Sequence, residues 1–110
     1  MDPLRIRNAC SETLVLSLLE KGPMHGYEMC KEIDRRSRGF FVFKHSTIYP
    51  ILHHMAEEGL VTSQWLEVET GKPQKQYRLT QKGPDYHKQN LMHWRELLAA
   101  LQSLVPEMSP

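Results

Sequence analysis

A change of hydrophobic period occurs within residues 46–80, which read STIYPILHHMAEEGLVTSQWLEVETGKPQKQYRLT. In the first part, apolar residues recur at the three- and four-residue spacing of one helix face, at Ile48, Ile51, Leu52 and Met55. Ser46 or Thr47 can cap the start of this helix, and Gly59 ends it. We therefore predict a helix over residues 46–58.

The second part of the stretch alternates with a period of two. Residues 60–68 place Thr62, Gln64 and Leu66 on one strand face, with Val61 and Trp65 on the other. Residues 70–73 (TGKP) carry turn formers, and Tyr77 and Leu79 then alternate with polar neighbours. This pattern predicts a two-stranded hairpin.

Two helices are predicted before this stretch. Residues 13–20 are apolar nearly all round, as in a buried helix, and Gly22-Pro23 supplies its stop. Tyr27, Cys30 and Ile33 then mark a short amphipathic helix that ends before Gly39, and Phe40–Phe43 is expected to be a brief segment packed on the core. Three helices and a hairpin in this order predict a mainly α protein with a small β hairpin, a winged helix-turn-helix.

The last segment carries a heptad seam. Its apolar residues are spaced three, four, three and four apart, at Leu91, Trp94, Leu98, Leu101 and Val105. Thr80 can cap this helix and Pro106 marks its end, which gives a long helix with more apolar surface than so small a domain needs. We therefore expect a homodimer, with a winged-helix domain over residues 1–80 and, over residues 81–110, a dimerisation helix packed on the same domain.

Composition and charge narrow the function classes. No apolar run approaches the roughly 18 residues that span a bilayer, and the N-terminus lacks a signal-peptide pattern, so we expect a cytoplasmic protein. The formal net charge is only +1, but basic residues cluster near residues 31–44 and 72–82. Cys10 and Cys30 are too few for a disulfide framework and are expected to be reduced and buried.

Neither a metal site nor an enzyme is indicated by the motifs. His53 and His54 are adjacent and point apart on a helix, and His87 and His93 are too far apart to chelate one ion unaided. We found no nucleophile with a base and an orienting acid, and no glycine-rich phosphate cradle. We therefore expect no metal, no cofactor and no catalysis.

Three motifs carry a family resemblance. Gly26-Tyr27-Glu28, residues 46–50 (STIYP) and residues 77–83 (YRLTQKG) resemble the PadR family of bacterial transcriptional regulators. The likeness runs from about Leu14 to Val105, and the single C-terminal helix is similar to that of the shorter subfamily. The resemblance implies a dimeric repressor whose third helix enters the major groove and whose hairpin touches the flanking backbone.

The resemblance also implies which residues contact DNA. The candidates are Ser46, Thr47, Tyr49, His53 and His54 on the reading helix and Lys72, Lys75 and Arg78 in the hairpin. The family usually has a glycine where Ser46 stands and commonly a basic residue where His54 stands. The reading helix therefore has no lysine or arginine to read bases with, and the alternative is a winged-helix protein-interaction module without DNA binding.

Trp94 allows two interpretations. Its indole can pack in the core or the dimer seam, where it offers a large apolar face and one donor. Some members of the family that it resembles sense planar aromatic compounds. On that basis Trp94, with Leu91 and Leu97, is the candidate site for a small aromatic effector.

Overall fold

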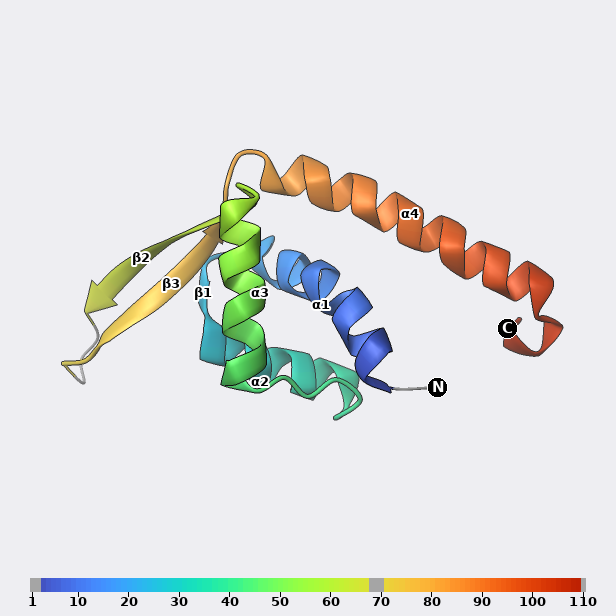
Figure 1. Ribbon diagram of the computed structural model, residues 1–110, viewed down its shortest axis with the longest axis horizontal. Coiled ribbons are helices and arrows are strands. Elements are labelled where there is room, and N and C mark those ends of the chain that lie inside the picture. The colour runs from blue at the N-terminus through green and yellow to red at the C-terminus, as the bar shows by residue number, and fades with distance from the viewer. Residues whose placement is uncertain (1–2, 68–70, 110) are drawn as a thin grey trace.

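The computed structural model describes residues 3–67 and 71–109, and within them it is mainly helical with a small sheet (Figure 1). Its elements are α1 (Pro3–Leu19), β1 (Met24–His25), α2 (Gly26–Ser37), α3 (His45–Glu57), β2 (Val61–Glu67), β3 (Pro73–Leu79), α4 (Gly83–Leu104) and a 3₁₀ turn (Pro106–Met108). The predicted fold class is confirmed: three helices precede a hairpin, and a long helix follows it.

One hydrophobic core holds the three N-terminal helices and the base of the hairpin together. α1 contributes Val15, Leu16, Leu18 and Leu19, from the apolar stretch that was predicted to form a buried helix, and α2 and α3 each contribute one stripe. The core residues are Val15, Leu16, Leu18, Leu19, Met29, Ile33, Phe43, Ile48, Leu52, Met55, Leu60, Val61 and Tyr77. Because the stripe of α3 faces this core, the opposite side of α3 is left open to solvent.

The sheet has three antiparallel strands in the order β1-β3-β2. β1 was not predicted, because a strand of two residues is too short to show alternation; it pairs with β3, with Met24 opposite Tyr77. β2 and β3 form the predicted hairpin, with Val61 opposite Leu79. Residues 68–70, which include part of the predicted turn, lie outside the described residues.

Both predicted caps are wrong. α3 begins at His45 after Lys44 as its N-cap, so Ser46 and Thr47 lie inside the first turn. The hydroxyl of Thr80 does not cap α4, which follows Lys82, but donates to the Gly59 carbonyl at 2.6 Å. Thr80 thus uses its hydroxyl for a contact with a residue far away in the sequence and not for a cap.

The loop between α2 and α3 was expected to pack on the core through residues 40–43, and only some of these residues do so. Phe43 is buried and Phe41 is half-buried against the core, but Phe40 is 70% exposed. Phe41 and Phe43 therefore serve the core, whereas Phe40 does not.

Figure 1 shows α4 leaving the compact body and extending far beyond it, and the molecule measures 54 × 29 × 21 Å. α4 contacts α1, where Asn90 and Trp94 bond to Thr13. Its predicted end is confirmed, since Pro106 opens a 3₁₀ turn; Val105, placed in the helical seam by the heptad spacing, instead has an extended backbone as the C-cap.

Candidate nucleic-acid interface

α3 carries five of the predicted DNA contacts. Ser46, Tyr49, His53 and His54 are exposed, and Thr47 is half-buried. Both imidazoles are held by a carboxylate one turn further on: His53 Nε2 lies 2.8 Å from Glu57 Oε1, and His54 Nε2 lies 2.6 Å from Glu58 Oε1.

Tyr49 is positioned by a glycine on another helix. A Cβ at Gly26 would lie 3.0 Å from the Tyr49 ring, so only glycine lets the ring lie this close to the start of α2. This contact brings the motifs at Gly26 and at Tyr49 together in space. It also holds the Tyr49 ring beside the hairpin.

The hairpin separates its basic residues. Lys75 pairs with Trp65 across the strands, whereas Arg78 pairs with Thr62. Because side chains alternate along a strand, Arg78 lies on the face opposite to Lys75. Lys72 is exposed between the strands, just before β3. Of the three predicted basic contacts, Lys75 is the one that the register brings to the same face as Trp65.

A hollow of about 540 Å³ lies between α3, the start of α2 and the hairpin; we call it the wing hollow. It is lined by His25, Tyr27, Tyr49, His53, Trp65, Pro73, Gln74, Lys75 and Tyr77. The Lys75 ammonium lies 5.8 Å from the centre of the Trp65 ring and 5.7 Å from that of Tyr77. Burial, with a smaller contribution from Tyr49, raises the pKa of the Tyr77 phenol.

Sequence reasoning placed Tyr49, His53 and Lys75 at a site but missed three of their neighbours. Trp65 lies on the same hairpin face as Lys75, and the strand alternation contained that signal. His25 and Tyr27 are brought in by the start of α2, and no local pattern links them to the hairpin.

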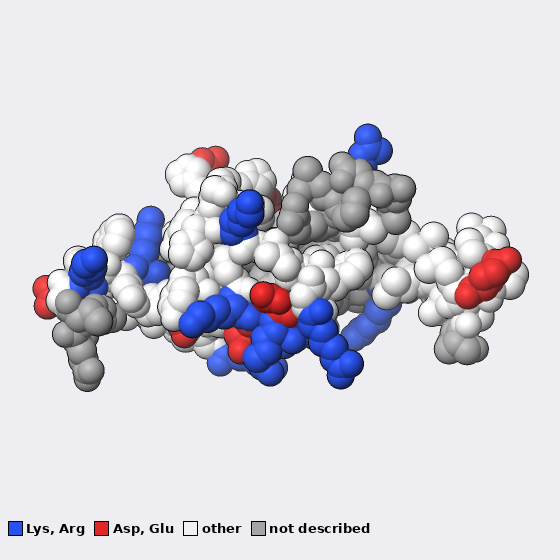
Figure 2. Space-filling model, turned by 90° about the horizontal axis from the view of Figure 1, so that it is seen from below, with Lys and Arg blue, Asp and Glu red and all other residues white. Residues whose placement is uncertain are grey.

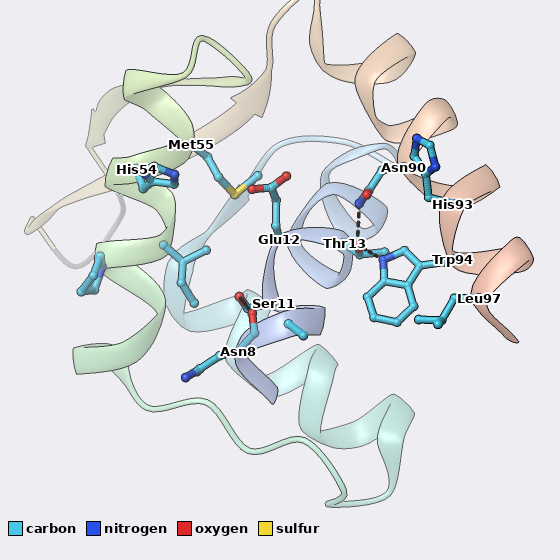
Figure 3. Close-up of a pocket in the computed structure, with 13 residues that line it drawn as sticks. Asn8, Ser11, Glu12, Thr13, His54, Met55, Asn90, His93, Trp94 and Leu97 are labelled. Carbon is cyan, nitrogen blue, oxygen red and sulfur yellow. Dashed lines mark hydrogen bonds between the residues drawn. The ribbon is translucent and has the colours of Figure 1, made fainter. Parts of the chain in front are cut away.

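A second hollow, of about 580 Å³, lies between α1, α3 and α4 (Figure 3); we call it the helix hollow. Here the Thr13 hydroxyl oxygen accepts two hydrogen bonds, from Asn90 Nδ2 at 2.7 Å and from Trp94 Nε1 at 2.8 Å. Trp94 and Leu97 line it, but Leu91, the third residue of the predicted effector site, does not.

The helix hollow also contains charged and polar groups. His54 lines it, so the structure places this predicted contact on the side of α3 that faces α1 and α4, not in the wing hollow. Glu12 also lines it, and a hydrogen bond to Glu12 is the main reason that the pKa of Tyr86 is raised to about 12.

Charged side chains also gather around α2. Figure 2 shows lysine and arginine side chains gathered on the face seen from below, the side on which α2 lies. Glu32 binds two of them, Arg35 at 2.9 Å and Arg36 at 2.8 Å. These bonds, led by that from Arg35, lower the pKa of Glu32 to about 2. Arg35 and Arg36 are therefore engaged on their own helix.

The outer half of α4 exposes a row of large apolar side chains. Leu98 is 52% exposed and Leu104 is 80% exposed, and Leu97 and Leu101 on the same helix are exposed as well. Single exposed apolar residues are ordinary on soluble proteins, but a row along one helix marks a contact surface.

Across residues 3–67 and 71–109, no three His, Cys, Asp or Glu side chains lie where they could share a metal ion. Cys10 and Cys30 are free and half-buried, and burial raises the pKa of both thiols. None of the described helices is both long and apolar enough to cross a membrane.

Comparison with known proteins gives one consistent family. A model of the "Transcriptional regulator PadR-like family" matches residues 15–89. The negative transcriptional regulator PadR of Bacillus subtilis is 35% identical over 80 residues, which are 73% of this chain and 42% of that protein. The transcriptional regulator YqjI of Escherichia coli is 34% identical over 77 residues, 70% of this chain and 35% of that protein. The chain thus spans less than half the length of these two regulators.

Solved structures agree with this comparison. A transcriptional regulator from Clostridium thermocellum superposes with a TM-score of 0.84 at 29% identity, covering 92% of this chain and 98% of that one. Bacillus subtilis PadR in complex with operator DNA superposes with a TM-score of 0.67 at 31% identity, covering 73% of this chain and 46% of that one.

Proposed function

The chain belongs to the PadR-like family of transcriptional regulators, and from that premise we propose that it is a cytoplasmic repressor that binds operator DNA as a homodimer. The observation that carries the proposal is the convergence of α3 and the hairpin. Tyr49 and His53 from the open side of α3 and Lys75 from β3 line one hollow, although the chain separates them by more than 20 residues.

A helix with one open face fits the major groove of DNA, and a hairpin beside it reaches the flanking backbone. On this chain the base-edge contacts fall to hydroxyls and imidazoles, since α3 has no lysine or arginine. Lys72 and Lys75 supply the permanent positive charge for phosphates. Bacillus subtilis PadR, which is similar over the same region, has been solved with operator DNA, which supports this arrangement.

The homodimer rests on α4. Its exposed leucines have no cover within the described chain, and a second copy of the same helix offers a matching apolar row. Two-fold pairing there would hold two α3 helices at a fixed separation, as half-sites about one helical turn apart require. In this proposal residues 81–110 serve as the dimerisation segment, packed on the winged-helix domain formed by residues 1–80.

The helix hollow supports a second element of the proposal, release by a small aromatic or hydrophobic effector. Trp94 and Leu97 give it apolar surface, and it touches both α3 and α4. A ligand bound there can change DNA affinity only if it prefers one arrangement of these helices to another.

Charge reversal in the hairpin tests the proposed function. The double variant Lys72→Glu, Lys75→Glu should lower duplex affinity by more than about tenfold and flatten its salt dependence, because phosphate contacts release counterions. The measurement is fluorescence anisotropy of a labelled duplex at several salt concentrations.

The matched control is Lys21→Glu, Lys88→Glu, which changes the net charge equally at exposed positions outside both hollows. It should leave the affinity within about twofold of wild type. Equal losses in both double variants would mean that net charge alone governs binding. A wild-type protein that binds no duplex would favour the protein-interaction module instead.

A further inference from the structure

We propose that the wing hollow seats one sugar-phosphate unit of the DNA backbone, with the Trp65 ring against the sugar and the Lys75 ammonium on the phosphate. This inference rests on the proposed DNA binding and adds residues to it, since Trp65 and Tyr27 then contact DNA.

The lining of the wing hollow suits a ligand with an apolar face and an anionic end. Trp65 is 67% exposed, although it is among the largest apolar side chains of the molecule, and Tyr27 and Tyr49 also present their rings to solvent. Large exposed rings beside one cation mark a binding surface. A deoxyribose has an apolar face to lie on such a ring, and the adjoining phosphate has the charge for the ammonium.

The charge of the hollow favours an anion. Of the described residues that line it, none is a carboxylate, and Lys75 is the one that carries a permanent charge. Two of the histidines that line it each lie beside a carboxylate: His53 Nε2 is 2.8 Å from Glu57 Oε1, and His25 Nε2 is 3.7 Å from Glu28 Oε1. The helix hollow, in contrast, contains Glu12.

Lys75 is held ready for such a contact. Its ammonium lies close to two rings, 5.8 Å from the centre of the Trp65 ring and 5.7 Å from that of Tyr77. No ion pair joins it to a carboxylate of the described residues, so a phosphate would not have to displace one. Contact with these two rings limits the motion of the flexible stem, which lowers the entropy lost on binding.

The position of the hollow selects the DNA backbone over a small ligand. Its walls are α3 on one side and the hairpin on the other, the two elements proposed to touch the same duplex. A strand that runs from the major groove at α3 to the hairpin must therefore cross its mouth. Contacts of this kind position the protein without reading sequence.

Substitution of Trp65 separates this inference from general DNA binding. Trp65→Ala should weaken operator and scrambled duplex alike, by about tenfold each, and leave the salt slope unchanged because indole is neutral. Lys75→Met should instead reduce the salt slope by roughly one per protomer. Phe40→Ala, which removes a similarly exposed ring outside the hollow, is the control and should bind as wild type does.

A second measurement uses the unaltered side chain. The protein has two tryptophans, so 5-fluorotryptophan labelling gives two ¹⁹F resonances, and the one absent from Trp65→Phe belongs to Trp65. As duplex is added up to saturation, that resonance should shift in step with the binding curve measured by anisotropy.

If duplex binds while the Trp65 resonance does not shift, or if Trp65→Ala binds duplex with wild-type affinity, the proposed backbone contact in the wing hollow is wrong. The proposed function is unaffected by either result. Either result would also be expected if the hollow takes a small ligand. A wild-type protein that binds no duplex overturns both.

Discussion

His87 is a polar residue at an apolar position. It lies in the second turn of α4 with 1% of its surface exposed, and neither ring nitrogen makes a hydrogen bond within the described chain. Its nearest charged neighbour is Glu20, whose Oε2 lies 3.5 Å from Nε2. A buried polar group without a hydrogen bond lowers stability, because the group loses water and gains no partner.

Replacing this imidazole should therefore stabilise the protein. We expect His87→Leu to raise the free energy of unfolding by about 1–2 kcal/mol, measured by urea denaturation followed by circular dichroism. His93→Leu is the control, because His93 is exposed on the same helix and should change stability little. A His87→Leu protein less stable than wild type would show that the contact with Glu20 outweighs the desolvation cost.

At the scale of elements, the junction between α1 and α4 depends on one hydroxyl. Thr13 Oγ1 accepts from both Asn90 and Trp94, and Figure 3 shows the two donors converging on it from α4. Without the Thr13 hydroxyl, the side-chain N–H groups of Asn90 and Trp94 lose their acceptor at a partly buried position.

Thr13→Val should therefore lower the free energy of unfolding by about 1–3 kcal/mol, although the side chain keeps its shape. Thr13→Ser keeps the hydroxyl and should recover most of the loss. The measurement is urea unfolding followed by tryptophan emission. Equal losses in the two variants would assign the stability to the threonine methyl group instead of the hydrogen bonds.

The elements themselves were largely predictable, and their junctions were not. The stripe from Ile48 to Met55 follows from the buried face of α3, so its period revealed that helix. β2 is exposed along most of its length, so the hairpin was indicated by residue types and turn formers and not by a buried face. The caps failed because Thr80 bonds Gly59, a partner 21 residues away that no local pattern contains. β1 failed for a similar reason, since it exists only by pairing with β3.

The candidate site divides in the same way. Residue types indicated Tyr49, His53 and Lys75, but only the fold brings them together with Trp65. The fold also separates His54 and Arg78 from that group, one toward α1 and α4 and the other to the opposite face of the hairpin.

At the scale of the whole molecule, the proposal joins two distant surfaces, the apolar row of α4 and the open side of α3. Binding by a dimer gains affinity because the second half-site is reached at high local concentration. A monomer should therefore bind its operator with much lower affinity, even though its own α3 is unaltered.

Leu98→Asp tests this coupling. A carboxylate in the apolar row should give a monomer in size-exclusion chromatography with light scattering, and should reduce operator affinity by at least about a hundredfold. Ser103→Asp adds the same charge at an exposed position on the opposite side of the same helix and should stay dimeric. A monomeric Leu98→Asp protein with unchanged operator affinity contradicts the coupling.

The central claim is that this chain reads DNA. Its most direct test is an anisotropy titration of the purified protein against labelled duplexes from the region upstream of its own gene, with scrambled duplex as competitor, at two salt concentrations. We expect binding that weakens steeply with salt and that scrambled duplex displaces poorly. Absence of binding at low salt, or binding that scrambled duplex abolishes as readily as the upstream sequence does, would contradict the claim.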